Sequence, residues 1–259
     1  MPRNQRAVSI LVILLFAGSP FATSIAQVGP ATPFHWSGQL SPDQTLDIKG
    51  ITGSISVDFI PGEITEVVAH KSGSGSELVD ITVVKIKGVT LICAIDPHSK
   101  GASAQACAGN TEWCKSECDG RGPKVDFIIH LPRSISLLNL AMVNGSITGH
   151  FSNANWPGQL SIRTVSGDIG LYLPIDINTH LDFQVPGRRL HSDFAMAAPH
   201  PLSAGRIVSS IGKGGGTLRI STVSGHVTLR RNLPGPSSER KDARFSPRSD
   251  AAVLKENSQ

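Results

Sequence analysis

Four cysteines are the residues of this chain whose type and spacing point most directly to chemistry. Cys93 ends a stretch typical of a β-strand, and Cys107, Cys114 and Cys118 follow in a loop rich in glycine, alanine and serine. In an exported chain, four cysteines favour two disulfides, which would stabilise a loop that buries little apolar surface. Three pairings are possible, and the spacing does not choose among them.

A metal site built from these thiols, with His98 as a further ligand, is the alternative to disulfides. The cysteines lack the paired CxxC spacing of common zinc sites, and an oxidising compartment disfavours free thiolates. We therefore expect disulfides, and neither a bound metal nor another cofactor.

Carboxylates would matter if the chain cleaved polysaccharides, because glycoside hydrolysis needs an acid and a partner carboxylate a few ångströms apart. The chain contains repeated turns centred on glycine, and the position after each glycine would form a row if the turns stack. That row reads Ser54, Ser146, Asp168, Arg188 and His226, so Asp168 is its one carboxylate.

Other catalytic patterns are also missing from the sequence. It contains no GxSxG, HExxH or phosphate-loop motif. The nine histidines are scattered, and four of them lie in or beside predicted strands: His130, His150, His180 and His226. The sequence therefore predicts a protein that is not an enzyme.

The elements that would position these residues are five similar segments, each centred on a turn glycine. They are LDIKGITGSI (46–55, Gly53), LNLAMVNGSI (138–147, Gly145), LSIRTVSGDI (160–169, Gly167), LDFQVPGRRL (181–190, Gly187, one residue shorter before the turn) and LRISTVSGHV (218–227, Gly225). The valines before the last four glycines lie 22, 20 and 38 residues apart, and 38 is close to two steps of 19. Such a period indicates stacked supersecondary units.

Within one unit, apolar residues alternate with polar ones on both sides of the glycine, as in strands with one buried face. A two-residue hairpin at Gly167 would turn Thr164 inward, whereas a solenoid corner would turn Val165 inward. The Val165 position is valine in all four copies after the first, and the Thr164 position varies. We therefore expect an all-β, β-solenoid-like stack of two-strand repeats, with a β-sandwich of hairpins as the alternative.

Longer runs rich in valine and isoleucine precede most of the repeats: TEVVAHK, VDITVVKIKGVTLICAI and KVDFIIHLP. The middle run is broken by a predicted turn at residues 86–88, and the SGSGS segment at 72–76 connects the first two runs. These runs predict an antiparallel, cysteine-containing N-terminal part of the domain.

The two ends of the sequence differ from its centre. Arg3 and Arg6 precede an apolar run at 7–18 and small residues at 24–26, which predicts a secretory signal peptide over residues 1–26, with an uncleaved anchor as the alternative. Residues 233–259 are polar and read as a disordered tail. The predicted domain therefore covers residues 34–232, outside the cytoplasm: periplasmic, cell-surface or secreted, with no transmembrane segment once the peptide is cleaved.

Charge and aromatic content exclude one class of partner. Loss of Arg3 and Arg6 with the signal peptide lowers the formal net charge from +4 to +2, and aromatic residues make up 5% of the chain. The sequence therefore shows neither a basic groove nor a stacking platform for nucleic acid.

Several motifs together resemble the bacterial putative-adhesin family of β-strand-repeat domains. They are the FxWSGxL opening (34–40), TLDIKGITGSI, VTLICAI with its cysteine-containing loop, KVDFIIHLP and the recurring [TM]V[NS]Gx[IV] turns. The resemblance covers residues 34–231, and the chain departs from it at residues 185–187, where proline replaces asparagine or serine. It implies an extracytoplasmic, β-solenoid-like domain with an adhesive or envelope-associated role, and it supplies no catalytic residues.

The sequence thus predicts an exported, non-enzymatic interaction domain whose partner is an envelope component, either protein or polysaccharide. A solenoid carbohydrate-binding module or polysaccharide-active enzyme is the alternative. A structural or stress-signalling component of the envelope would differ only in its ligand.

Overall fold

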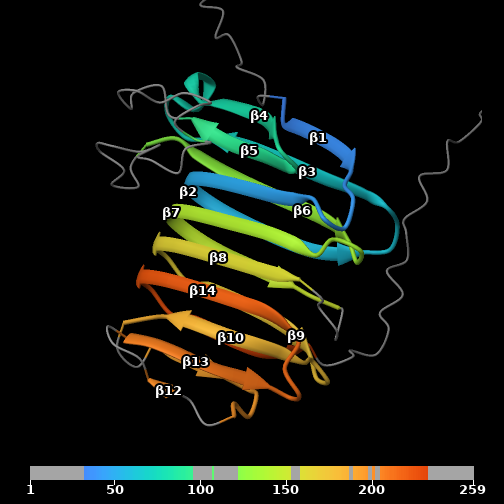
Figure 1. Ribbon diagram of the computed structural model, residues 1–259. Helices are drawn as coiled ribbons and strands as arrows, with labels where there is room; N and C mark the ends of the chain where they lie inside the picture. The colour runs from blue at the N-terminus through green and yellow to red at the C-terminus, as the bar shows by residue number, and fades with distance from the viewer. Residues whose placement is uncertain are drawn as a thin grey trace, which may run out of the picture. The chain divides into compact units, whose positions relative to one another are not determined.

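The computed structural model of the chain describes residues 32–95, 107, 122–152, 158–186, 189–197, 200–201 and 205–232. These residues belong to one compact unit, Thr32–Gln259, and their fifteen strands form one mixed β-sheet (Figure 1). The predicted all-β class is confirmed. The predicted signal peptide and tail lie outside the described residues.

In chain order the strands are β1 (Phe34–Gln39), β2 (Thr45–Ile60), β3 (Ile64–Ser72), β4 (Asp80–Ile86), β5 (Val89–Ile95), β6 (Lys124–Pro132), β7 (Leu137–His150), β8 (Gln159–Ser166), β9 (Ile169–Pro174), β10 (Thr179–Gln184), β11 (Leu190–Ser192), β12 (His200–Pro201), β13 (Arg206–Ile211), β14 (Gly216–Ser224) and β15 (Val227–Asn232). A short 3-10 turn, η1 (Ser76–Leu78), precedes β4.

Each repeat bends at its glycine without pairing its two arms to each other. In the unit around Gly167, β8 pairs in parallel with the first half of β7 and with β14. After the bend, β9 pairs in parallel with the second half of β7 and with β15. The bend is therefore a corner between stacked strands rather than a hairpin turn, although the description of the whole domain as a solenoid stays a prediction.

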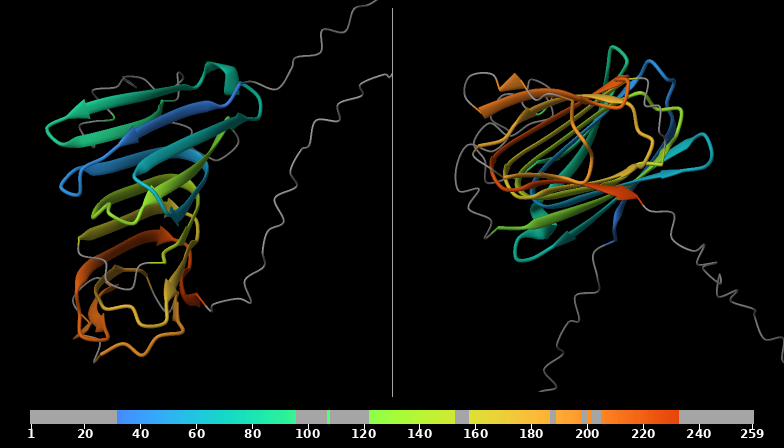
Figure 2. Two further views of the ribbon diagram at one scale, coloured as in Figure 1. Left: turned by 90° about the vertical axis from the view of Figure 1, so that its right-hand side faces the viewer. Right: turned by 90° about the horizontal axis from the view of Figure 1, so that it is seen from below.

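The corners divide the strand segments into two layers that face each other across the core (Figure 2). The first layer contains, in order, the first halves of β2 and β7, then β8, β14, β10 and β13. The second layer contains β3, β6, the second halves of β2 and β7, then β9 and β15. Leu160 and Ile162 of β8 and Ile169 and Leu171 of β9 are buried between the layers, as the alternation predicts.

The N-terminal runs form strands as predicted, but their pairing is only partly antiparallel. β3 pairs antiparallel with β1 and β6, and β4 pairs antiparallel with β5 across the predicted turn, where Lys87 and Gly88 both have positive φ (44° and 80°). However, β5 and β6 each pair in parallel with β2. The N-terminal part is therefore continuous with the stack of repeats.

The predicted inward position of Val165 is wrong. Val165 and Val223 are 49% and 65% exposed, whereas Thr164 and Thr222 are almost fully buried. The reason is that β8 continues its alternation through Ser166, so Thr164 lies on the same face as Leu160 and Ile162. The Thr164 hydroxyl donates a hydrogen bond to the carbonyl oxygen of Gly145 (3.2 Å). Because threonine has the shape of valine and this bond satisfies its hydroxyl, it can occupy the buried position.

Val185 is buried, yet it does not support the prediction, because the copy around it was aligned one residue out of register. In the structure β10 pairs with β14 so that Leu181 lies beside Leu218 and Gln184 beside Ser221. Val185 thus continues the row that contains Thr222, not the row that contains Val223. The four valines are not equivalent positions.

Within the part of the chain that the structure describes, no helix is long and apolar enough to cross a membrane.

Candidate functional site

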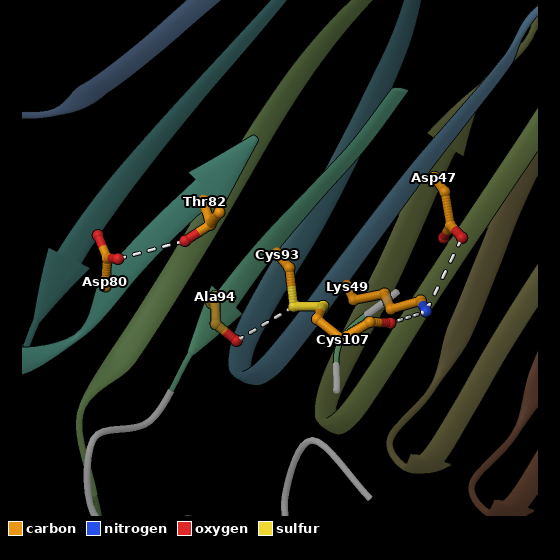
Figure 3. The surroundings of a disulfide bond; sticks show 7 residues. All are labelled: Asp47, Lys49, Asp80, Thr82, Cys93, Ala94 and Cys107. Atoms are coloured by element: carbon orange, nitrogen blue, oxygen red, sulfur yellow. Dashed lines mark hydrogen bonds and ion pairs between the residues drawn. A yellow bond between two sulfur atoms is a disulfide. The ribbon is translucent and has the colours of Figure 1, made fainter. Parts of the chain in front are cut away.

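The structure joins Cys93 to Cys107 in a disulfide, with their Cα atoms 6.5 Å apart (Figure 3). Both cysteines are fully buried and pack with Leu91. The predicted disulfide chemistry is therefore confirmed for this pair. Cys114, Cys118 and the alternative metal ligand His98 lie outside the described residues, so the second bridge stays a prediction.

The disulfide covers a buried amine on the neighbouring strand β2. The Lys49 Nζ atom donates a hydrogen bond to the Cys107 carbonyl oxygen and lies 3.9 Å from the Asp47 carboxylate (Figure 3). Burial lowers the pKa of the Lys49 amine and raises the pKa of the Asp47 carboxyl, and in both cases the attraction between the two groups partly opposes the shift. The disulfide-linked Cys107 therefore covers Lys49, on the outer side of β2, from solvent.

The repeat-turn glycines form a column at the corner. A Cβ atom on Gly145 would lie 1.9 Å from the Gly53 carbonyl oxygen, and one on Gly167 would lie 2.0 Å from that of Gly145. A Cβ on Gly225 would lie 1.9 Å from the Gly167 oxygen. These positions need glycine because successive corners approach backbone to backbone. Gly187 lies outside the described residues.

The position after each glycine also stacks, as the sequence indicates. Ser54 lies in register beside Ser146, and the Asp168 carboxylate accepts a hydrogen bond from the His226 backbone amide (2.8 Å). Arg188 of this row lies outside the described residues. The row continues from Ser54 to Asp126 on β6, whose carboxylate accepts a hydrogen bond from the Ser54 hydroxyl (2.6 Å). Its two described carboxylates, Asp126 and Asp168, are therefore separated along the row by Ser54 and Ser146.

The most distinctive surface is a groove on the outer side of the first layer, with a volume of about 470 Å³. Strands β8, β14, β10 and β13 form its floor. Its polar lining residues are Ser161, Arg163, Asp182, Gln184, Arg206, Arg219 and Ser221. We call this surface the arginine groove.

A single carboxylate at the centre of the arginine groove is held by two guanidinium groups. Asp182 accepts hydrogen bonds from Arg206 Nε and Nη2 (2.8 and 2.9 Å) and from Arg219 Nε (3.0 Å). The Asp182 side chain is 13% exposed, whereas those of the two arginines are about half exposed. Arg206 is the main cause that lowers the pKa of Asp182, burial opposes it, and Arg219 lowers the pKa further. Asp182 is therefore an anion at any physiological pH and a poor proton donor.

Arg163 on β8 is the third guanidinium of the arginine groove. It is exposed, and it forms no ion pair within 4 Å with any residue that the structure describes, although its charge acts on Asp47 and Lys49 nearby. A smaller hollow of about 190 Å³ adjoins it, lined by Lys49, Val165 and Val223 among others. The groove thus offers one unpaired cation, two partly engaged cations and a neighbouring apolar stripe.

The second layer carries histidines that the sequence left scattered. His130 lies 3.8 Å from Glu66, His150 lies 3.1 Å from Asp58, and the His150 ring stacks on Tyr172 with centroids 4.5 Å apart. All five residues fall in one row across β3, β6, β2, β7 and β9. Among the described residues, however, no three histidine, cysteine or acidic side chains are grouped so as to hold a metal.

Alignment of the repeats on their turn glycine does not reveal the arginine groove, because the copy that contains Asp182 is one residue shorter before its glycine. Aligning the copies on their leading leucine instead places Asp47, Asn139, Ser161, Asp182 and Arg219 at one position, which is the row that the structure forms. That alignment was the available signal for a charged row.

Comparison with known proteins gives no family assignment. No family model matches the chain, and no curated protein matches it. One similar solved structure is a putative cell adhesion protein from Clostridium sporogenes, with a TM-score of 0.42 and 12% identity, over 77% of this chain and 100% of that one. Another is a putative adhesin from Bacteroides fragilis, with a TM-score of 0.22 and 10% identity, over 78% of this chain and 97% of that one. Neither likeness is close enough to support a conclusion about this chain.

Proposed function

We propose that this protein is a non-enzymatic, adhesin-like binding domain that acts outside the cytoplasm and holds an extended envelope ligand in the arginine groove. The observation that carries the proposal is the unpaired, exposed Arg163 beside a carboxylate held between two guanidiniums. An exposed charged row on rigid, in-register strands suits recognition of a ligand that runs across several strands.

The dimensions of the arginine groove support an extended ligand rather than a small one. The groove crosses four neighbouring strands, β8, β14, β10 and β13. Since strands lie about 4.8 Å apart, the distance from the first to the fourth is about 14 Å. A shallow surface of this length gives many modest contacts instead of one enclosing pocket.

The chemistry of Asp182 favours binding over hydrolysis. Glycoside cleavage uses a carboxylic acid whose pKa is raised so that it can donate a proton, together with a second carboxylate. Arg206 and Arg219 lower the pKa of Asp182 instead, and Asp182 is the one carboxylate among the described residues that line the groove. A polysaccharide-active enzyme therefore remains the less favoured alternative.

The disulfide supports the proposed location. A buried Cys93–Cys107 bridge persists in oxidising compartments and is rare where glutathione keeps thiols reduced. Together with the signal peptide predicted for residues 1–26, it favours a periplasmic, cell-surface or secreted protein.

Co-sedimentation of the intact, oxidised chain with isolated envelope fractions tests the proposal. Peptidoglycan, outer polysaccharide and membranes would be compared for the unchanged protein, the Arg163→Ala variant and an Arg230→Ala control, which removes an exposed arginine from β15 in the second layer. We expect saturable retention on one fraction, lost in Arg163→Ala and kept in the control. Release of new reducing ends from a polysaccharide would overturn the proposal in favour of the enzyme.

A further inference from the structure

We infer that the ligand of the arginine groove is an acidic polysaccharide, in which carboxylates occur among free hydroxyl groups. This inference rests on the proposed function and narrows it to one chemical class.

The net charge of the groove selects an anionic ligand. Its lining holds three guanidiniums, of Arg163, Arg206 and Arg219, against the single carboxylate of Asp182, which gives a net charge of +2. Lys49 and Asp47 lie beyond one end, near enough to Arg163 to interact with it electrostatically. They contact each other, so their opposite charges add nothing to the net charge, and Lys49 is covered by Cys107. The excess positive charge that a ligand can reach therefore comes from the three arginines.

The arrangement of polar groups selects a ligand with hydroxyls. Asp182 accepts hydrogen bonds, Gln184 both accepts and donates, and Ser161 and Ser221 do the same with their hydroxyls. A sugar hydroxyl can donate to Asp182 while it accepts from a neighbouring guanidinium. A nucleic acid or a heavily sulfated chain carries closely spaced negative charges, which the Asp182 carboxylate would repel.

Base stacking is not available in this groove. No aromatic ring is among the described residues that line it. Proteins that bind single-stranded nucleic acid without sequence preference rely on such rings as well as on cations. The observations therefore favour a sparsely charged glycan over a nucleic acid.

The register of the strands sets the spacing of the charges. Arg163, Ser221, Gln184 and Arg206 lie side by side on β8, β14, β10 and β13, in one row that runs across the strands. This row begins and ends with an arginine, on strands about 14 Å apart, and has two uncharged hydrogen-bonding side chains between them. The Arg206 guanidinium lies toward β10, where it hydrogen-bonds to Asp182. A polymer lying along the row would place carboxylates at both ends and hydroxyls in the middle.

The length of the row predicts how affinity depends on the ligand. A single uronic acid reaches one arginine, whereas a chain long enough to span the row reaches both. We therefore expect oligomers to bind more tightly than the monomer, with binding weakened by salt because the contacts are exposed ion pairs.

Binding of defined polymers to the intact, oxidised chain tests the inference. The probes are polygalacturonate, alginate, fully methyl-esterified polygalacturonate, in which the carboxylates are masked on the same backbone, and single-stranded DNA. Variants Arg163→Gln and Arg206→Gln alter the ends of the row, and Arg230→Gln is the matched control on the second layer. Thermal unfolding of each variant checks that the exposed substitutions leave the fold intact.

We expect a uronate polymer to bind, with a loss of about tenfold or more in affinity for Arg163→Gln and for Arg206→Gln and no loss for the control. The esterified polymer should bind at least about tenfold more weakly than the acid. The inference would be overturned if the esterified polymer bound as tightly as the acid and its binding still depended on Arg163, or if DNA bound more tightly than the uronate polymers. In either case the arginine groove would still be a binding site, but for a different ligand. Failure of every probe would also overturn the inference, whereas the proposed function fails if Arg163→Ala leaves envelope retention unchanged or if reducing ends are released from a polysaccharide.

Discussion

The glycine column at the corner makes a strong prediction about stability, which the change Gly167→Ala tests. An added Cβ would lie 2.0 Å from the Gly145 carbonyl oxygen, where ordinary contacts begin at 3.4 Å. The φ of Gly167 is also +154°, which L-residues rarely adopt. The close contact requires the two stacked corners to separate, and the φ adds strain in the backbone of residue 167 itself.

The expected loss follows from two contributions. Holding a residue with a side chain at such a φ costs about 1–3 kcal/mol. Separating the corners by the missing 1.4 Å weakens the bonds from Ile147 N to the Asp168 oxygen (3.0 Å) and from the Thr164 hydroxyl to the Gly145 oxygen (3.2 Å). Each such bond contributes about 1 kcal/mol net. We therefore expect Gly167→Ala to lower the free energy of unfolding by about 3–5 kcal/mol.

Urea unfolding followed by circular dichroism measures this loss against two controls in the same repeats. Gly170→Ala, where nothing lies within 4 Å of the new Cβ, should be neutral or stabilise the fold by about 0.5–1 kcal/mol. Gly225→Ala meets the same kind of contact, 1.9 Å, without a φ in that range, so its cost should fall between the two. If Gly167→Ala unfolds within about 1 kcal/mol of Gly170→Ala, the close-approach account of the corner is refuted.

Three further predictions concern the corner hydroxyl, the disulfide and the arginine groove. Thr164→Val should lower the free energy of unfolding by about 1 kcal/mol in urea titrations, because it leaves the Gly145 carbonyl without that donor; equal or greater stability would contradict this contribution of the hydroxyl. Cys93→Ala should cost about 3 kcal/mol, given a disulfide that closes 14 residues, and reductant should remove the difference from the unchanged protein. The pKa of Asp182 is lowered in the folded state, so its stabilising contribution is present above 3.8 and is lost as pH falls through the lower folded value. Unfolding measured between about pH 5 and 2 should therefore be less pH-dependent for Asp182→Asn, and an unchanged slope would argue against the ion pairs.

The buried face of each strand could be predicted from the sequence, because it depends only on local alternation. Leu160, Ile162, Ile169 and Leu171 alternate with polar residues, and all four are buried. The same reasoning located the longer N-terminal strands, since β-branched runs between turn residues need no knowledge of their partners. The same reasoning did not determine which strands they pair with. The sequence predicts antiparallel pairing among the N-terminal strands, whereas β5 and β6 each also pair in parallel with β2.

The face of the residues next to the corner could not be predicted from hydropathy. Thr164 and Val165 have nearly the same shape, and the buried one is the one whose hydroxyl reaches a corner carbonyl. Uniform valine at the Val165 position indicates the opposite face, but Val185 belongs to the row of Thr222 and not to the row of Val223. The unbroken alternation of β8 decides which residue faces inward, since Met142 is buried at the same position of β7 without any hydroxyl.

The arginine groove depends on topology to a greater degree. Asp182 meets Arg206 and Arg219, which are 24 and 37 residues away, only because β10 lies between β13 and β14. A repeat period suggests that copies stack, but it does not say that β14 lies between β8 and β10. The sequence thus shows which charged side chains exist, but it does not predict that these three lie next to one another.

Parallel, in-register stacking also explains why such a surface can carry a binding function without weakening the fold. Away from the corners, inward positions of neighbouring copies are apolar, as at Leu138, Leu160 and Leu218, because they fill one core. Outward positions in the next row have no such restriction, and they read Asn139, Ser161 and Arg219. A ligand that crosses the strands contacts one side chain from each copy. The residues that determine which ligand binds are therefore residues that contribute little to the core. Substitutions along this outward row should therefore change ligand binding far more than the free energy of unfolding. Substitutions at the adjacent inward positions should change the free energy of unfolding far more than ligand binding.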